Sequence, residues 1–346
     1  MKLRKLPFLC AIFCTAAFLE AMPALGAKNI GTLSFYFEND CFARTDRYYT
    51  NGVKVSWISP DLTAYRQSGK LPAWSLPLIR RLPFINKSGL QHNIGLCMGQ
   101  NMYTPREISR QDLIENDRPY AGWGYVGVGF HSKNERRLDS IEIQIGMVGP
   151  ASFAEQTQKF VHKLGGWQQP NGWDNQIKNE PGLVFVYERK WRFFRAGAFE
   201  GLGFDAISHL GGALGNVYTF ANTGIEARLG WRIPSDFGAS LIRPAGDASA
   251  PVSAKDPRLS GNQGFSINLF GSIDARAVGR NIFLDGNTFR ESHSVDKKYF
   301  VADLAAGVSL IIHRFKISFA RVMRTKEFKG QEDSQSFGSI TLSLSW

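Results

Sequence analysis

Apolar and polar residues alternate at every second position through much of this chain, and this period constrains the fold more than any other feature. In residues 138–148 the apolar set alternates with a polar or glycine set: Ile141, Ile143, Ile145 and Met147 against Ser140, Glu142, Gln144 and Gly146. A two-residue period places the two sets on opposite faces of a β-strand. An apolar face suits lipid and a polar face suits a barrel interior, so the pattern predicts strands of a membrane β-barrel.

Repeating segments of this kind predict about twelve strands, an even number of the sort usual in bacterial single-chain barrels. They lie near residues 30–39, 50–59, 91–100, 121–131, 137–148, 182–192, 196–206, 217–231, 263–275, 299–312, 314–325 and 337–346. The last one ends on the aromatic Trp346, which resembles the recognition signal of outer-membrane proteins. A soluble β-sandwich or lipocalin-like barrel would also alternate. The aromatic terminus favours an all-β, 12-stranded antiparallel transmembrane β-barrel.

The N-terminus has the layout of a secretory signal peptide. Basic residues precede an apolar run over residues 6–19, and a small-residue stretch follows over residues 21–27. That run is too short for a membrane-spanning helix, and no later apolar stretch approaches the ~20 residues that such a helix needs. We therefore expect a signal peptide over residues 1–27 and a single barrel domain over residues 28–346 in the cell outer membrane.

The formal net charge is +11. A basic balance fits nucleic acid or anionic lipid as a partner, and a purely solubilising charge is the alternative. Export from the cytoplasm argues against nucleic acid and favours the phosphate-rich outer leaflet of an outer membrane.

Two cysteines, Cys41 and Cys97, remain after the signal segment. Their spacing matches no metal or redox motif. One disulfide and two free thiols are both open.

Strand parity predicts which connections face outward. If the first strand begins at the periplasm, the outer loops are residues 40–49, 101–120, 149–181, 207–216, 276–298 and 326–336. Two inner connections, 60–90 and 232–262, are unusually long for periplasmic turns. Neither contains a second domain, so both are interpreted as decorated turns.

Five polar clusters all fall on the outer side. They are Glu38-Asn39-Asp40, Tyr49-Thr50-Asn51-Gly52, Gly99-Gln100 with Tyr103-Thr104-Pro105, Asn116-Asp117-Arg118, and the loop from Gly149-Pro150 through Gln158 and His162 to Trp173-Asp174-Asn175-Gln176. Asn, Asp, Gly and Pro also form ordinary turns. Convergence of distant segments at one rim favours a functional site, because loops on a rigid scaffold are where function usually lies.

Residues 152–164 predict a short helix in the third outer loop. One side is formed by Phe153, Thr157, Phe160, Val161 and Leu164. Gln158 and His162 lie one turn apart on the opposite side and are placed to act on one bound group. An incidental histidine on a surface helix is the alternative. Parity also places His209 and His293 outside, but only His162 lies in a loop dense with candidate groups.

The sequence contains no Gly-x-Ser-x-Gly turn, no phosphate-binding loop and no zinc spacing of Cys or His. A serine-led hydrolase is therefore disfavoured. One histidine with carboxylates and amides remains, and oxygen ligands suit calcium better than zinc. Such a group supports ester hydrolysis, in which a neutral imidazole removes a proton from water.

The five clusters are similar to the motifs of the lipid A 3′-O-deacylase family, and the resemblance covers essentially the whole mature chain. It implies a twelve-stranded outer-membrane barrel with calcium-dependent esterase activity. Such an enzyme removes the 3′-linked acyloxyacyl group from lipid A of lipopolysaccharide in the outer leaflet. We expect a monomer with lipid A as its substrate and with no nucleic-acid partner.

The resemblance also implies roles for individual residues. His162 would be the general base that activates water, and Asp40 would help to hold calcium. Asn39, Thr50 and Gln158 would orient groups or contribute to the oxyanion site.

Two further positions leave alternatives. Arg118 is a candidate for binding a lipid A phosphate or, equally, for a salt bridge at the rim. Six residues after His162, where the family pattern leads us to expect an acidic residue, the chain has Gln168. The amide oxygen of Gln168 or a main-chain carbonyl would then serve calcium.

Two other functions compete with the esterase. A non-catalytic pore, adhesin or structural barrel would have a lumen lined by charged residues such as Glu142, Glu226, Arg228 and Asp274. An outer-membrane phospholipase or acyltransferase would use the same rim with another lipid or acyl acceptor.

Overall fold

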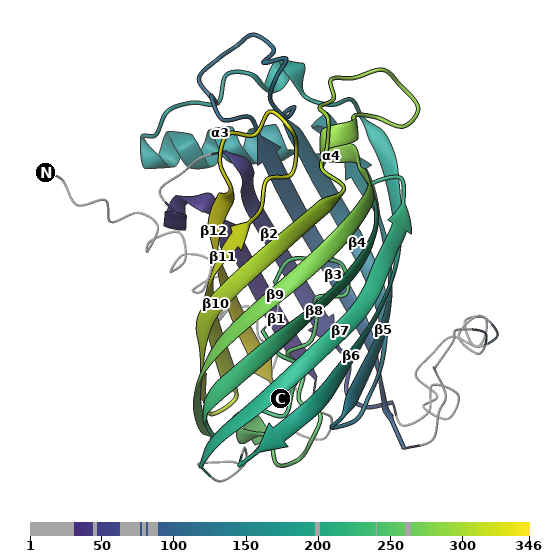
Figure 1. Ribbon diagram of the computed structural model, residues 1–346, viewed down its shortest axis with the longest axis vertical. Coiled ribbons are helices and arrows are strands. Elements are labelled where there is room, and N and C mark those ends of the chain that lie inside the picture. Colours follow the sequence, from purple (N-terminus) through teal and green to yellow (C-terminus); the bar gives the residue numbers. More distant parts are fainter. Residues whose placement is uncertain are drawn as a thin grey trace, which may run out of the picture.

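The computed structural model describes residues 31–43, 47–62, 89–197, 201–239, 241–259 and 264–346, with positions 77 and 81. Within these residues, twelve antiparallel strands form a closed barrel in which consecutive strands pair and β1 pairs with β12 (Figure 1). The predicted fold is confirmed. No helix in the described part is long and apolar enough to span a membrane. The predicted signal peptide lies outside the described residues.

The strands agree with the prediction to within a few residues at most ends. They are β1 (Thr32–Asn39), β2 (Tyr48–Ile58), β3 (Gln91–Thr104), β4 (Ala121–Lys133), β5 (Arg137–Val148), β6 (Glu180–Ala196), β7 (Leu202–Gly215), β8 (Tyr218–Trp231), β9 (Phe265–Asn281), β10 (Phe300–Ile312), β11 (Phe315–Arg324) and β12 (Gln335–Ser345). Strands β3 and β9 run further outward than predicted.

Strand β7 corrects the prediction most clearly. It was expected near residues 196–206 with an outer loop over 207–216, but most of that loop is strand. Gly211 and Gly212 suggest a turn, yet they lie in the sheet because the neighbouring backbone is close. A Cβ at Gly211 would lie 2.6 Å from the Tyr187 carbonyl oxygen. His209, expected outside, therefore points into the lumen and bonds Asp274 at 2.8 Å.

The barrel wall is apolar outside and polar inside, the inverse of a soluble protein. In β11, Phe315, Ile317 and Phe319 are exposed on the outer surface, whereas Lys316 and Ser318 between them are buried in the lumen. Outward apolar side chains meet lipid, and inward polar ones hydrogen bond inside the barrel. The two-residue period of the sequence is thus the alternation between membrane and lumen.

The connection between β8 and β9 fills the lumen. The parts described, residues 233–239 and 241–259, are called here the lumen segment, and Figure 1 shows this coil running inside the ring of strands. Asp236 bonds Arg228 at 2.6 Å, Lys316 at 2.6 Å and Arg258 at 3.0 Å. The prediction of a decorated periplasmic turn was wrong here, because buried charges need partners and the lumen supplies them.

A second carboxylate of the lumen segment binds the opposite wall. Asp247 accepts a hydrogen bond from the Tyr36 hydroxyl at 2.7 Å and pairs with the Lys54 ammonium at 2.9 Å. The seam between the first and last strands is also bridged from inside. The Ser249 hydroxyl lies 3.3 Å from that of Ser34 on β1 and 3.4 Å from that of Ser343 on β12. The lumen segment is therefore fixed to several sides of the barrel at once.

Candidate active site

The third outer loop carries a helix whose polar side faces the barrel. Helix α3 (Ala154–Gly165) buries Ala154, Gln158 and His162, which lie four residues apart. Phe160 and Leu164 on its other side are 63% and 62% exposed. In Figure 1, α3 lies across the end of the barrel that also carries α4 (Ile282–Asp285). The helix was predicted, and its two sides are divided as expected, but the apolar side is the one that faces outward.

The loop reaches the wall because the wall lacks side chains there. A Cβ at Gly122 of β4 would lie 2.0 Å from the Ser152 hydroxyl oxygen and 2.4 Å from the Ala154 Cβ. The amide of Gln100 on β3 donates to the Ser152 carbonyl at 2.6 Å. Ala154 then joins a buried cluster with outward-facing residues of the wall and residues of the outer loops, namely Met102, Ile108, Tyr120 and Trp173. The helix is thereby held against the outer surfaces of β3 and β4.

His162 is held in one orientation by its own loop. Its Nδ1 lies 2.5 Å from the main-chain oxygen of Gln168, and its ring meets Trp167 edge-on at 5.7 Å. A carbonyl oxygen only accepts hydrogen bonds, so Nδ1 carries the proton in the neutral imidazole. The basic lone pair is then on Nε2, which is the arrangement of a general base. Gly166, with a left-handed backbone at φ 61°, ends the helix and turns the chain back toward the histidine.

Gln158 is fixed one turn before His162. Its Oε1 accepts a hydrogen bond from the indole N–H of Trp173 at 2.8 Å. Since an indole nitrogen only donates, this bond decides which end of the amide is oxygen. The Nε2 of Gln158 is buried and has no hydrogen-bond partner among the described residues. A buried, unsatisfied N–H donor is costly unless a ligand uses it, so this amide is suited to receive a developing negative charge.

The second half of the site comes from β1 and β2. Asn39 ends β1, and its Oδ1 accepts from the Cys41 N–H at 2.7 Å, which caps the short helix η1 (Asp40–Ala43). Asp40 is buried, and its Oδ2 accepts from the Arg47 N–H at 2.5 Å. The Thr50 hydroxyl lies 2.6 Å from that of Thr104, at a β-bulge between Tyr49 and Asn51.

The strand register relates the two halves. Asn39 pairs with Asn51, and Asn51 pairs with Met102, over which Ala154 of α3 packs. Neighbouring strands are about 4.8 Å apart, so roughly 10 Å separates β1 from β3 at this level. Six of the seven predicted site residues thus belong to one end of the barrel wall on β1, β2 and the α3 loop. They are Asn39, Asp40, Thr50, Gln158, His162 and Gln168.

Arg118 is the exception. Its guanidinium is buried, pairs with Glu327 at 3.1 Å and lies over the Tyr103 ring at 4.7 Å. Of the two roles left open by the sequence, the salt bridge is the one present in the structure. Glu327 uses only the Nη1 of Arg118, and the Nε and Nη2 atoms are buried without a hydrogen-bond partner among the described residues.

The donors that this site offers a metal are oxygen atoms. No group of three or more His, Cys, Asp or Glu side chains placed to share an ion occurs in the described part of the chain. Asp40 supplies one carboxylate, and Asn39 and Thr50 supply neutral oxygens. Calcium accepts amide, hydroxyl, carbonyl and water oxygens beside a carboxylate, so this chemistry fits calcium and not zinc. Gln168, expected among the ligands, instead offers its main-chain oxygen to His162, and its side chain is exposed.

Three supporting contacts were not predicted from the sequence. Trp173 orients Gln158, Thr104 bonds Thr50, and the main chain of Gln168 orients His162. Trp173 and Thr104 belong to the polar clusters and Gln168 was expected to bind calcium, but each contact joins parts of the fold that the sequence does not show together. Of the two possibilities left open by the sequence, Cys41 and Cys97 are not joined by a disulfide.

Comparisons with known proteins agree with the barrel fold. The family model described as "Outer membrane protein LpxR" matches residues 8–346. The solved structure of LpxR from Salmonella typhimurium is similar with a TM-score of 0.71 at 16% identity, covering 90% of this chain and 99% of that one. No curated protein sequence matches the chain.

Two autotransporter structures match with much lower TM-scores. The β domain of Bordetella BrkA has a TM-score of 0.36 at 10% identity, covering 92% of this chain and 98% of that one. The translocator domain of NalP from Neisseria meningitidis has a TM-score of 0.35 at 7% identity, with coverages of 99% and 97%. Neither bears on the site. Because the family model spans nearly the whole chain, this protein belongs to the LpxR family of outer-membrane barrels, the lipid A 3′-O-deacylase family that its motifs resemble.

Proposed function

We propose that this protein is a lipid A 3′-O-deacylase that hydrolyses the ester of the 3′-linked acyloxyacyl group in the outer leaflet. One observation carries the proposal. His162 and Gln158 lie together on the wall-facing side of α3, one oriented by a carbonyl and the other presenting an unpaired buried amide N–H. Family membership supports the same reaction.

The reaction follows from what these two groups do. The Nε2 of His162 removes a proton from a water molecule, whose oxygen attacks the ester carbonyl carbon. The carbonyl oxygen becomes negatively charged, and the Gln158 Nε2–H donates a hydrogen bond to it. The intermediate then breaks its bond to the sugar 3′ oxygen, which takes the proton from His162. The products are a carboxylic acid and a 3′ hydroxyl group, so all atoms of water and ester are accounted for.

Calcium is part of the proposal. Asp40 would hold it, with Asn39 and Thr50 near the same position, and a bound calcium ion would supply positive charge for the oxyanion. Asn39 also positions Asp40 by capping η1, and Thr50 is fixed by Thr104. Both are positioning residues, which act through the groups that they hold.

The outer side of α3 supports a position of the site at the membrane interface. Phe153, Phe160 and Leu164 are at least 62% exposed, and Lys159 and Lys163 lie beside them on the helix. A helix with an exposed apolar side flanked by lysines lies at a membrane interface, with the apolar side among acyl chains. The ester of a lipid in the outer leaflet therefore lies at the depth of the catalytic groups.

The lumen argues against the competing pore. Three of its four proposed channel residues bind the lumen segment or its neighbours: Glu142 accepts from the Ala245 N–H, Glu226 accepts from the Ala239 N–H, and Arg228 pairs with Asp236. A phospholipase or an acyltransferase would use similar catalytic groups. Only the reaction products distinguish these two activities from deacylation.

The test is mass spectrometry of lipid A from a host that expresses the wild type, the His162→Gln variant or the His293→Gln variant. His293 also lies in an outer loop and bonds the Asp117 carbonyl, so it is a matched control. We expect loss of one acyloxyacyl group with the wild type and His293→Gln. His162→Gln should be slower by about 10²–10⁴-fold, the usual contribution of a general base.

Barrel folding is checked by heat-modifiable migration of each variant. Equal trimming by folded His162→Gln would exclude His162 as the base. Release of fatty acid from phospholipid would indicate a phospholipase instead of a deacylase. Transfer of acyl groups to another lipid would indicate an acyltransferase.

A further inference from the structure

A cavity of about 750 Å³ lies on the outer wall across β7 to β11, away from α3 on β3 and β4. Its floor consists of small outward-facing residues on β8, β9 and β10: Ala221, Ala275, Ala277 and Ala302. Leu210 and Phe300 flank the floor and are 56% and 80% exposed. Apolar side chains that border an alanine floor on a lipid-facing wall form a groove with the dimensions of acyl chains.

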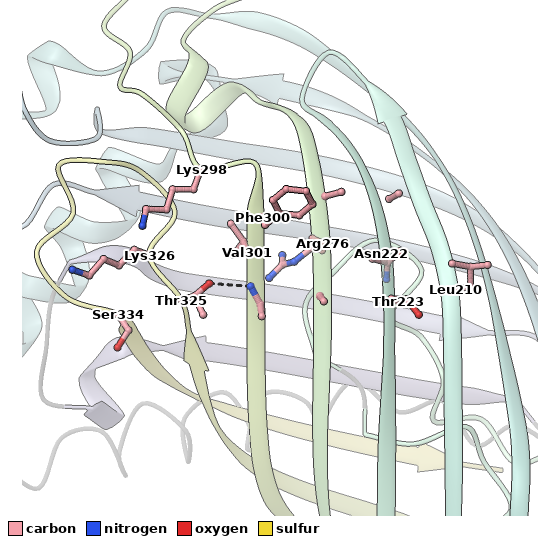
Figure 2. A pocket seen from close by; sticks show the side chains of 14 residues that line it. Leu210, Asn222, Thr223, Arg276, Lys298, Phe300, Val301, Thr325, Lys326 and Ser334 are labelled. Atoms are coloured by element: carbon pink, nitrogen blue, oxygen red, sulfur yellow. Dashed lines mark hydrogen bonds between the residues drawn. The ribbon is translucent and has the colours of Figure 1, made fainter.

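The outer end of this groove is cationic. Lys298 and Lys326 line it, with Ser334 nearby, and Figure 2 shows the two lysine side chains pointing the same way from neighbouring segments. Neither ammonium has a hydrogen bond or ion pair with the part of the chain that the structure describes. Two nearby lysines, in contrast, have ion-pair partners: Lys297 pairs with Asp285 at 2.8 Å and Lys329 pairs with Asp296 at 3.0 Å.

The wall itself explains why the groove is shallow and open at this end. Strand β10 begins at Phe300, opposite Ala277, whereas β9 continues outward to Asn281. The Thr325 hydroxyl oxygen closes the strand end by accepting a hydrogen bond from the Ala302 N–H at 2.9 Å. The backbone at this rim is therefore satisfied, and the two ammonium groups are left for a ligand.

The chemistry of the groove selects an anionic lipid. An apolar floor that faces the membrane accepts an acyl chain, and two ammonium groups at the outer end accept a phosphate. A phosphate monoester carries about −1.5 to −2 charges at neutral pH, which two lysines complement better than the single charge of a phosphodiester. Lysine binds phosphate as a point charge and needs no fixed planar geometry.

We propose that this groove is a second lipid site, which binds a phosphorylated glycolipid of the lipid A class through its phosphate monoester and one acyl chain. It lies on different strands from the catalytic groups and shares no residue with them. The site does not depend on the proposed esterase, because binding here requires only that the barrel stands in the outer membrane, the location of this family.

Native mass spectrometry of the purified full chain in detergent tests the site, with bisphosphorylated lipid A and, separately, phosphatidylglycerol as probes. The test variant is Lys298→Gln/Lys326→Gln. Each ammonium contributes roughly five-fold to anionic lipid binding, so the affinity for one bound lipid A should fall about twenty-five-fold. The matched control Lys178→Gln/Lys329→Gln removes the same charge from outer-loop positions that do not line the groove, and it should retain wild-type binding.

A second variant tests the floor without changing charge. Ala277→Trp fills the groove and should remove the same bound lipid while migration on heating stays that of a folded barrel. Unchanged lipid counts in both variants would overturn the site. Phosphatidylglycerol bound as tightly as lipid A, and lost with the same lysines, would overturn the glycolipid class. The number of lipid A molecules bound in this groove by a His162→Gln protein should equal that of the wild type. Failure of the esterase proposal would therefore not change the result for the groove.

Discussion

The indole N–H of Trp173 donates to Oε1 of Gln158 across 2.8 Å, and this bond joins the far side of the third outer loop to the wall-facing side of its helix. Trp173 itself is buried and packs against Tyr120 with ring centres 4.8 Å apart. The orientation of one amide is therefore set by a residue fifteen positions away in the chain.

Trp173→Phe tests that orientation. The phenyl ring keeps much of the packing with Tyr120 but cannot donate, so the Gln158 amide loses the bond that selects its direction. We expect kcat to fall about ten-fold, the effect of roughly one hydrogen bond, with KM nearly unchanged. Trp231→Phe, on the lipid-facing surface of β8, is the control. Steady-state kinetics in mixed micelles measure both constants. An unchanged kcat would show that the orientation of Gln158 by Trp173 does not contribute to catalysis.

Gly122→Ala tests the seating of α3 on the wall. The added methyl would occupy space taken by Ser152 and Ala154, so the loop must move outward and carry His162 with it. A displacement of about 1 Å is enough to cost roughly 10²-fold in rate. Gly271→Ala is the control, because the nearest atom to its added Cβ is 3.9 Å away. Deacylation should fall only in Gly122→Ala, while both proteins keep heat-modifiable migration.

Calcium dependence tests the role of Asp40. Excess EGTA should stop deacylation in mixed micelles, and added calcium should restore it. Asp40→Asn removes the carboxylate but keeps the size of the side chain, so half-maximal activity should need at least ten-fold more calcium. Asp333→Asn changes an exposed carboxylate near Arg47 and should leave the calcium titration unchanged. Full activity of the wild type in EGTA would exclude calcium from the reaction.

Asp236→Asn tests the lumen segment and carries a pH dependence. Burial opposes ionisation of Asp236, but Lys316, Arg228 and Arg258 outweigh burial and hold its pKa well below the usual range. A lowered folded pKa stabilises the protein above the unfolded pKa of about 4, and this contribution is lost as the pH falls below that value. Breaking one partner of a buried ion pair costs about 3–5 kcal/mol.

The thermal midpoint of heat-modifiable migration should therefore be lower in Asp236→Asn at pH 7. The difference from the wild type should narrow as the pH is lowered below about 4, because the stability contributed by the wild-type carboxylate is then progressively lost. Asp112→Asn, at an exposed pair with Arg110, is the control. Equal midpoints at pH 7 would show that the ion cluster does not stabilise the barrel.

The barrel was predictable because its signal is local. The two-residue alternation of β5 or β11 depends only on which face meets lipid, and most other strands show the same alternation. The exception, β7, was misplaced because Gly211 and Gly212 carry no side chain to show the alternation. Their presence reflects the closeness of neighbouring backbone, which is a property of the assembled sheet.

For the candidate site, the sequence predicted that distant residues lie at one end of the barrel, but it did not predict their contacts. The spacing of Gln158 and His162 placed both on one side of a helix, as observed. The sequence could not show that this polar side of α3 would be buried, because its burial depends on Gly122, which lies in strand β4. The hydrogen bond from His162 to the main chain of Gln168 could not be predicted either, because every residue type has a main-chain carbonyl oxygen.

The bridge from Ser249 to Ser34 and Ser343 has a consequence for how the protein is made. The first and last strands of the chain become neighbours only when synthesis is complete, and a closed ring of strands has no side entrance. The segment that carries Ser249 therefore enters either before β1 and β12 join or through an open end of the finished barrel. Once inside, its hydroxyl contacts both strands of the seam, so the two ends of the chain meet on a stretch made between them.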